Sequence, residues 1–156
     1  MKHYILTFLS VFILSISVQS QTISQLVNEV KLDSLTKKVN ELTGEISTVV
    51  DGNTVTIINR QQVNNDIAAD YIKQKFEELD NLTITDQAFN TNGRNIIATQ
   101  LGKTNPENIY IVCAHYDSVA DYCASDNASG TAAVLEIARL LSTQCTDNTI
   151  VYALWD

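Results

Sequence analysis

The chain has 156 residues, of which 45% are apolar, and a formal net charge of −8. This length corresponds to about one domain. A chain so acidic lacks the positive surface with which proteins bind nucleic acids or anionic membranes, so we expect neither as a partner.

The first twenty residues have the pattern of a secretory signal. Lys2 precedes an apolar run from Tyr4 to Val18, which ends in the small-residue stretch Val18-Gln19-Ser20. A basic start, a short apolar segment and a small-residue exit are typical of export leaders, and the run is short for a membrane-spanning helix. We therefore expect residues 1–20 to be removed, with no stable membrane anchor left. Loss of Lys2 changes the net charge from −8 to −9, and the mature protein is expected to be secreted or periplasmic.

Residues 21–60 are expected to form two helices followed by a hairpin. Thr22 opens a capping-box pattern that starts the first helix, and Asp33 is placed to cap the second. Two β-rich runs, 46–50 and 54–58, flank the sequence Asp-Gly-Asn, which favours a tight hairpin turn.

Residues 61–156 alternate between helical and strand patterns. The expected elements are a helix that opens at Asn64-Asn65-Asp66, strands at 82–89, 95–101 and 108–114, a helix at 128–141 and a strand at 149–155. The last three form a strand–helix–strand unit. The predicted fold is therefore α/β, with a partly parallel, mixed sheet flanked by helices. The strand at 108–114 is apolar throughout after Asn108, which is typical of a strand buried on both faces.

A candidate metal site lies in the segment AHYDSVADYCASDNASG, residues 114–130. His115 ends the apolar strand and Asp126 precedes the next helix, and ligands of open α/β sheets bind beyond the carboxyl ends of strands. Imidazole and carboxylate groups are ligands for zinc and similar ions. Asp117 is placed to accept a hydrogen bond from the second ring nitrogen of His115. A solvated loop with a surface histidine is the alternative that this spacing leaves open.

The motifs AHYDS and SDNASGTAAVLEIARLL, followed by NTIVYALWD, resemble the M28 family of zinc peptidases. The segments DIAADYIKQKFEEL and GRNIIATQLG are also similar to sequences that precede the first metal ligand in that family. The resemblance covers about residues 60–156, and residues 22–60 more loosely. It implies a secreted, zinc-dependent exopeptidase of aminopeptidase type, with two zinc ions on an α/β fold and a peptide or protein as substrate.

The resemblance implies a role for three side chains. His115 would bind one zinc ion, and Asp126 would bridge both zinc ions. Asp117 would not bind zinc itself but would orient the ring of His115. Asn127 commonly follows the bridging aspartate in the family.

The family's other functional groups lie beyond the strand that ends here at Trp155. There a Glu-Glu pair supplies the general base and a further ligand, and an aspartate and a histidine ligand come later. This chain ends at Asp156, so residues 61–156 are expected to be an incomplete, N-terminal part of the peptidase domain. Because a catalytic zinc ion normally has three protein ligands, we expect the 156-residue chain to be inactive alone. We also expect it to be only marginally stable, because the strand at 149–155 would leave apolar surface exposed.

Several residues around the expected ligands have a less specific meaning. Ser129 and Gly130 fit a tight helix entry, where a small residue lets the backbone approach the site, although plain helix capping explains them equally well. Asp121 and Cys123 match no family role and are expected to be loop residues.

The three cysteines are Cys113, Cys123 and Cys145. An odd number leaves at least one thiol without a partner in the chain. Cys113 lies in an apolar run and is expected to be a small core residue. The sequence does not decide whether Cys123 and Cys145 form a disulfide.

Three other functions compete with the peptidase. Glutaminyl cyclases and carboxypeptidase-like members share the expected architecture with altered metal use. A secreted, non-catalytic module would use the acidic loop to bind cations or a partner. A dinucleotide-binding unit is disfavoured, because no glycine-rich turn follows the strand at 108–114.

Overall fold

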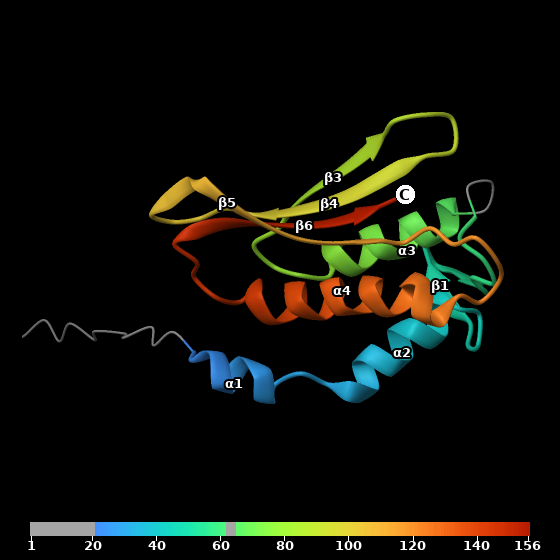
Figure 1. Cartoon of the computed structure of the whole chain (residues 1–156), viewed down its shortest axis with the longest axis horizontal. Helices are drawn as coiled ribbons and strands as arrows, with labels where there is room; N and C mark the ends of the chain where they lie inside the picture. Colours follow the sequence, from blue (N-terminus) through green and yellow to red (C-terminus); the bar gives the residue numbers. More distant parts are fainter. Residues whose placement is uncertain (1–20, 62–64) are drawn as a thin grey trace, which may run out of the picture.

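The computed structural model describes residues 21–61 and 65–156. A four-stranded sheet has helices α3 and α4 under one face, and α1 and α2 lie on the far side of α4 (Figure 1). The elements are α1 (Ile23–Asn28), α2 (Leu32–Leu42), β1 (Thr48–Val50), β2 (Asn53–Val55), α3 (Asp66–Glu77), β3 (Thr83–Ala88), β4 (Arg94–Gln100), β5 (Asn105–His115), the irregular turn η1 (Ala124–Ala128), α4 (Ser129–Leu141) and β6 (Asn148–Trp155). The expected leader, residues 1–20, lies outside the described residues, as does Asn64.

Both predicted N-terminal helices are present. Thr22 makes the expected capping box, since its Oγ1 accepts a hydrogen bond from the Gln25 N–H at 3.3 Å and its own N–H donates to Gln25 Oε1 at 2.8 Å. Helix α2 begins earlier than predicted. Lys31 is its N-cap and Asp33 lies in its first turn, so the prediction that Asp33 caps this helix was wrong.

The predicted hairpin is present but short. Strands β1 and β2 pair antiparallel, and Asp51 and Gly52 form the turn with φ angles of 47° and 78°. Two successive residues with positive φ match the twist of a two-residue hairpin. The pairing stops at Val55 because the chain then turns inward, where Ile57 is buried in the core.

The main sheet has the order β3-β4-β6-β5. The pairs β3–β4 and β4–β6 are antiparallel, whereas β5 and β6 are parallel and joined by α4. This arrangement confirms the predicted mixed, partly parallel sheet and its strand–helix–strand unit. Strand β6 has neighbours on both sides, and its register places Trp155 beside His115. The carboxyl ends of β5 and β6 therefore lie together.

The prediction that the apolar strand β5 is buried on both faces was wrong. Strand β5 is an edge strand of this sheet, and its side chains at Ile109, Tyr110 and Ile111 are 58%, 63% and 60% exposed. Cys113 is also exposed, so its predicted place in the core was wrong too. Val112 and Ala114 pack against the core on the side of α4. The exposed apolar surface thus lies on β5 and not, as expected, along β6.

One core joins the sheet to the helices. Its largest fully buried apolar side chains come from α2, α3, β4, α4, β6 and the residue after β5, and they are Leu42, Tyr71, Ile72, Phe76, Ile96, Tyr116, Leu135, Tyr152 and Leu154. The helical spacing predicted most of the buried face of α3 and part of that of α4. None of the helices in the described ranges combines the length and apolar character that crossing a bilayer needs.

A buried carboxylate fastens α2 to α4. The side chain of Glu136 is 3% exposed and accepts hydrogen bonds from the Lys31 N–H at 3.1 Å, from Lys38 Nζ at 3.3 Å and from Arg139 Nη2 at 2.7 Å. Burial acts to raise the pKa of this carboxyl. The hydrogen bonds from Arg139 and Lys31 and the charge of Lys38 outweigh burial and lower the pKa of Glu136 to about 2.

Candidate metal centre

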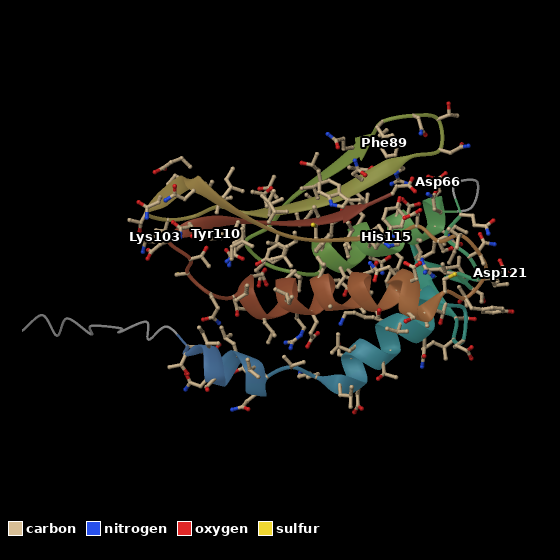
Figure 2. The ribbon with its side chains drawn as sticks, viewed as in Figure 1. Asp66, Phe89, Lys103, Tyr110, His115 and Asp121 are labelled. Atoms are coloured by element: carbon tan, nitrogen blue, oxygen red, sulfur yellow. The ribbon has the colours of Figure 1, made fainter. Side chains whose placement is uncertain are left out.

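The fold brings the three predicted site residues together. His115 is the last residue of β5, Asp117 follows two residues later, and Asp126 lies in η1 just before α4. Figure 2 shows His115 at the end of the sheet where β5 and β6 finish. The ring Nδ1 of His115 lies 2.9 Å from Asp117 Oδ1, and Nε2 lies 3.1 Å from Asp126 Oδ1. Each ring nitrogen therefore faces one carboxylate.

The donor atoms are accessible from solvent. The side chains of His115, Asp117 and Asp126 are 46%, 41% and 75% exposed. Two atoms bound to one tetrahedral zinc ion at about 2.0–2.1 Å lie roughly 3.3 Å apart. The 3.1 Å between His115 Nε2 and Asp126 Oδ1 is close to that separation, and the nitrogen and oxygen donors suit zinc.

The donor set is incomplete in the part of the chain that the structure describes. No cluster of three or more histidine, cysteine, aspartate or glutamate side chains able to hold a metal occurs in residues 21–61 and 65–156. His115 and Asp126 thus fit two positions of a zinc site, and a catalytic zinc ion normally has three protein ligands.

Comparison with known proteins places this geometry in a family. Residues 95–156, which hold β4 to β6 and all three site residues, match the profile of peptidase family M28. Over this segment, which is less than half of the chain, the protein is similar to peptidase family M28. A probable zinc metalloprotease of Leptosphaeria maculans is 41% identical over 68 residues, 38% of this chain and 16% of that protein. A probable zinc metalloprotease of Pyricularia oryzae is 39% identical over 67 residues, 37% of this chain and 13% of that protein.

Solved structures share the fold over most of the chain. The LapA aminopeptidase of Legionella pneumophila has a TM-score of 0.67 and 14% identity, over 88% of this chain and 40% of that one. The glutaminyl cyclase of Fimbriiglobus ruber has a TM-score of 0.66 and 18% identity, over 82% of this chain and 46% of that one. At these identities the likeness shows the α/β fold of M28-type peptidases and no more.

Hydrogen bonds at the first turn of α4 connect the two parts of the M28-like motif. The Gly130 N–H donates to Asn127 Oδ1 at 3.0 Å, and a Cβ atom at position 130 would collide with the Asn127 side chain. The buried Thr131 donates from Oγ1 to the His115 carbonyl at 3.2 Å. Asn127 therefore caps the first turn of the helix, and Thr131 anchors that turn to the strand end that carries His115.

Asp121 and Cys123 lie in the loop of the M28 segment, as predicted. Asp121 pairs with Asn59 through the backbone, and Cys123 has a left-handed backbone with φ of 33°. All three cysteines are free thiols. Cys123 and Cys145 lie beyond opposite ends of the 13-residue helix α4, which is about 20 Å long. They are therefore too far apart to form the disulfide that the sequence left open.

Two residues near the candidate site were missed by sequence reasoning. Asp156, after β6, accepts hydrogen bonds from Asn65 Nδ2 at 2.5 Å and from the Arg94 N–H at 3.1 Å. Burial, and then the charge of Asp117, raise the pKa of Asp156 against those hydrogen bonds. The other residue is Arg60, which is fully buried beneath the loop. No local pattern in the sequence distinguishes either residue from an ordinary polar one.

Proposed function

We propose that this chain forms part of a zinc-dependent exopeptidase of aminopeptidase type, with a peptide or protein as substrate. One observation carries the proposal: within an M28 segment, His115 Nε2 and Asp126 Oδ1 lie 3.1 Å apart while Asp117 occupies the other ring nitrogen of His115.

Each of the three side chains has a distinct part in the proposed reaction. His115 presents Nε2 as a ligand, because a hydrogen bond from its Nδ1–H to Asp117 fixes the tautomer and the ring orientation. Asp126 supplies a carboxylate that is able to bridge two ions. When bound, zinc supplies the polarisation of a peptide carbonyl and the activation of water.

The choice of reaction rests on the relatives and not on the fold. The structures that share the fold include both an aminopeptidase and a glutaminyl cyclase. The curated relatives that are 41% and 39% identical are named as probable zinc metalloproteases, which favours peptide hydrolysis over cyclisation. The aminopeptidase type and the binding of two zinc ions rest on the family resemblance.

The test is hydrolysis of amino-acid anilides by the full-length gene product, with and without a chelator. We expect chelator-sensitive turnover that His115→Ala and Asp126→Asn abolish together with zinc binding. Asp121→Asn is the matched control, because Asp121 is a carboxylate of the same loop but pairs through its backbone with Asn59. Full turnover by His115→Ala, or equal losses in the control, would sink the proposal.

Two further expectations belong to this proposal. Since the described residues offer two zinc donors, we propose that residues 21–156 alone do not hydrolyse peptides. The assay is the same one, with residues 21–156 in place of the full-length protein, and sustained zinc-dependent turnover would contradict it. We also propose export to the periplasm or the medium, which N-terminal sequencing of the processed protein tests.

A further inference from the structure

Arg60 is a buried cation that binds main-chain oxygens. Its side chain is fully buried, and within the described residues it forms no ion pair with a carboxylate at contact distance. Burial lowers the pKa of the guanidinium, and the negative groups of Cys123, Asp117 and Asp126 act to raise it. Burying a charge costs free energy unless its hydrogen bonds are satisfied, so the partners of Arg60 indicate what it does.

Most of those partners are carbonyl oxygens of the loop between β5 and α4. Arg60 Nε donates to the Tyr116 carbonyl at 2.7 Å, and Nη2 donates to the Cys123 carbonyl at 2.9 Å. Nη1 donates to the carbonyls of Leu42 and, at 3.4 Å, Tyr122. Tyr116 lies between His115 and Asp117, and Cys123 is three residues before Asp126, so one guanidinium spans both arms of the loop.

The backbone of Arg60 holds the same loop. Its N–H donates to Ser118 Oγ at 2.9 Å, and its carbonyl accepts from the Ser118 N–H at 3.1 Å. Ser118 Oγ in turn donates to the Ala120 carbonyl at 2.9 Å. These bonds fasten the loop at its start, independently of the guanidinium.

The loop adopts a conformation that needs support. Tyr122 and Cys123 have φ angles of 67° and 33°, in the left-handed region that side-chain-bearing residues rarely adopt. Such conformations persist where surrounding contacts impose them. The carbonyls of both residues accept hydrogen bonds from Arg60, which supplies those contacts.

We propose that Arg60 is the positioning residue of this zinc-binding loop between β5 and α4. It holds residues 116–123 so that Asp117 and Asp126 reach the two ring nitrogens of His115. The statement about zinc rests on the proposed function, whereas the statement about loop geometry does not. Lysine cannot replace arginine here, because an ammonium group is a point donor and cannot span the carbonyls of Tyr116 and Cys123 in the fixed fork of a guanidinium.

The test compares Arg60→Lys with Arg139→Lys in the full-length protein. Arg139 is the matched control, since it is a hydrogen-bonded arginine that binds Glu136 and the Glu29 carbonyl, away from the loop. Two quantities are measured: hydrogen exchange of residues 116–128 and zinc affinity by calorimetry. We expect Arg60→Lys to speed exchange of this segment and to weaken zinc binding by about 10- to 100-fold, as loss of a supporting partner does. Arg139→Lys is expected to change neither.

Unchanged exchange of residues 116–128 in folded Arg60→Lys would overturn the inference, as would unchanged zinc affinity. If Arg60→Lys does not fold, Arg60→Gln decides the matter. Its neutral amide leaves no unpaired buried charge but cannot span the carbonyls of Tyr116 and Cys123, so it is expected to speed exchange of the same segment. Failure of the natural protein to bind zinc would refute the proposed function instead, and the exchange measurement would still judge Arg60.

Discussion

Asp117 offers the sharpest test of how the candidate site works. Asp117→Asn keeps the size of the side chain and removes the charge that faces His115 Nδ1 at 2.9 Å. Substitution of such a partner typically costs 10- to 100-fold in metal affinity. Because the Asp117 side chain is 41% exposed, solvent screens its charge, and we expect the lower end, about 10-fold or about 1.4 kcal/mol.

The assay is zinc titration of the full-length protein by calorimetry, with Asp121→Asn as the control of equal charge change in the same loop. The two variants differ in that Asp117 is hydrogen-bonded to the ring of His115, whereas Asp121 is joined to Asn59 by its backbone. Zinc binding as tight in Asp117→Asn as in the natural protein would refute the reasoning, and so would equal losses in the two variants.

Three further predictions concern the contacts around the site and the core. For Glu136, whose pKa is about 2 in the fold against an ordinary 4.5, the lowered pKa stabilises the fold fully above pH 4.5, and this stabilisation fades as pH falls from there toward 2. Urea unfolding should therefore show the natural protein losing about 2 kcal/mol more than Glu136→Gln between pH 7 and pH 3, and parallel losses would contradict this. Asn127→Ala should lower the free energy of unfolding by about 1 kcal/mol in the natural chain and hardly at all in a Gly130→Ala background, because the Cβ added at position 130 already displaces the Asn127 side chain. Equal losses in both backgrounds would refute the contact. Thr131→Val should cost about 1–2 kcal/mol in thermal unfolding by removing the bond to the His115 carbonyl. Thr146→Val is its control and should be neutral or stabilising, because Oγ1 of Thr146 is buried without a partner among the described residues.

Much of the fold was predictable because its signals are local. Alternating and apolar runs predicted β3, β4 and β6, and helical spacing predicted α3 and α4 within a few residues. The burial of β5 was not predictable in this way. An apolar strand has the same sequence pattern whether it lies in the centre of a sheet or at an edge. The order β3-β4-β6-β5, which leaves Ile111 and Cys113 exposed, is set by pairing between distant segments.

The candidate site also has a part that the sequence predicts and a part that it does not. His115, Asp117 and Asp126 lie within twelve residues, so their spacing and the strand–helix junction were enough to predict that they meet. Arg60 could not be recognised, because most of its partners are carbonyl oxygens more than fifty residues later in the chain. A carbonyl carries no signature in the side-chain sequence, so a role that consists of binding the backbone becomes visible only in three dimensions.

The central claim is that His115 and Asp126 bind zinc in an M28 peptidase site. Anomalous X-ray scattering at the zinc edge, from crystals of the full-length protein grown with zinc, tests it most directly. We predict a peak about 2.0–2.2 Å from both His115 Nε2 and an Asp126 carboxylate oxygen, with Asp117 still hydrogen-bonded to Nδ1. A zinc ion bound elsewhere, with His115 and Asp126 left facing only each other, would contradict the account.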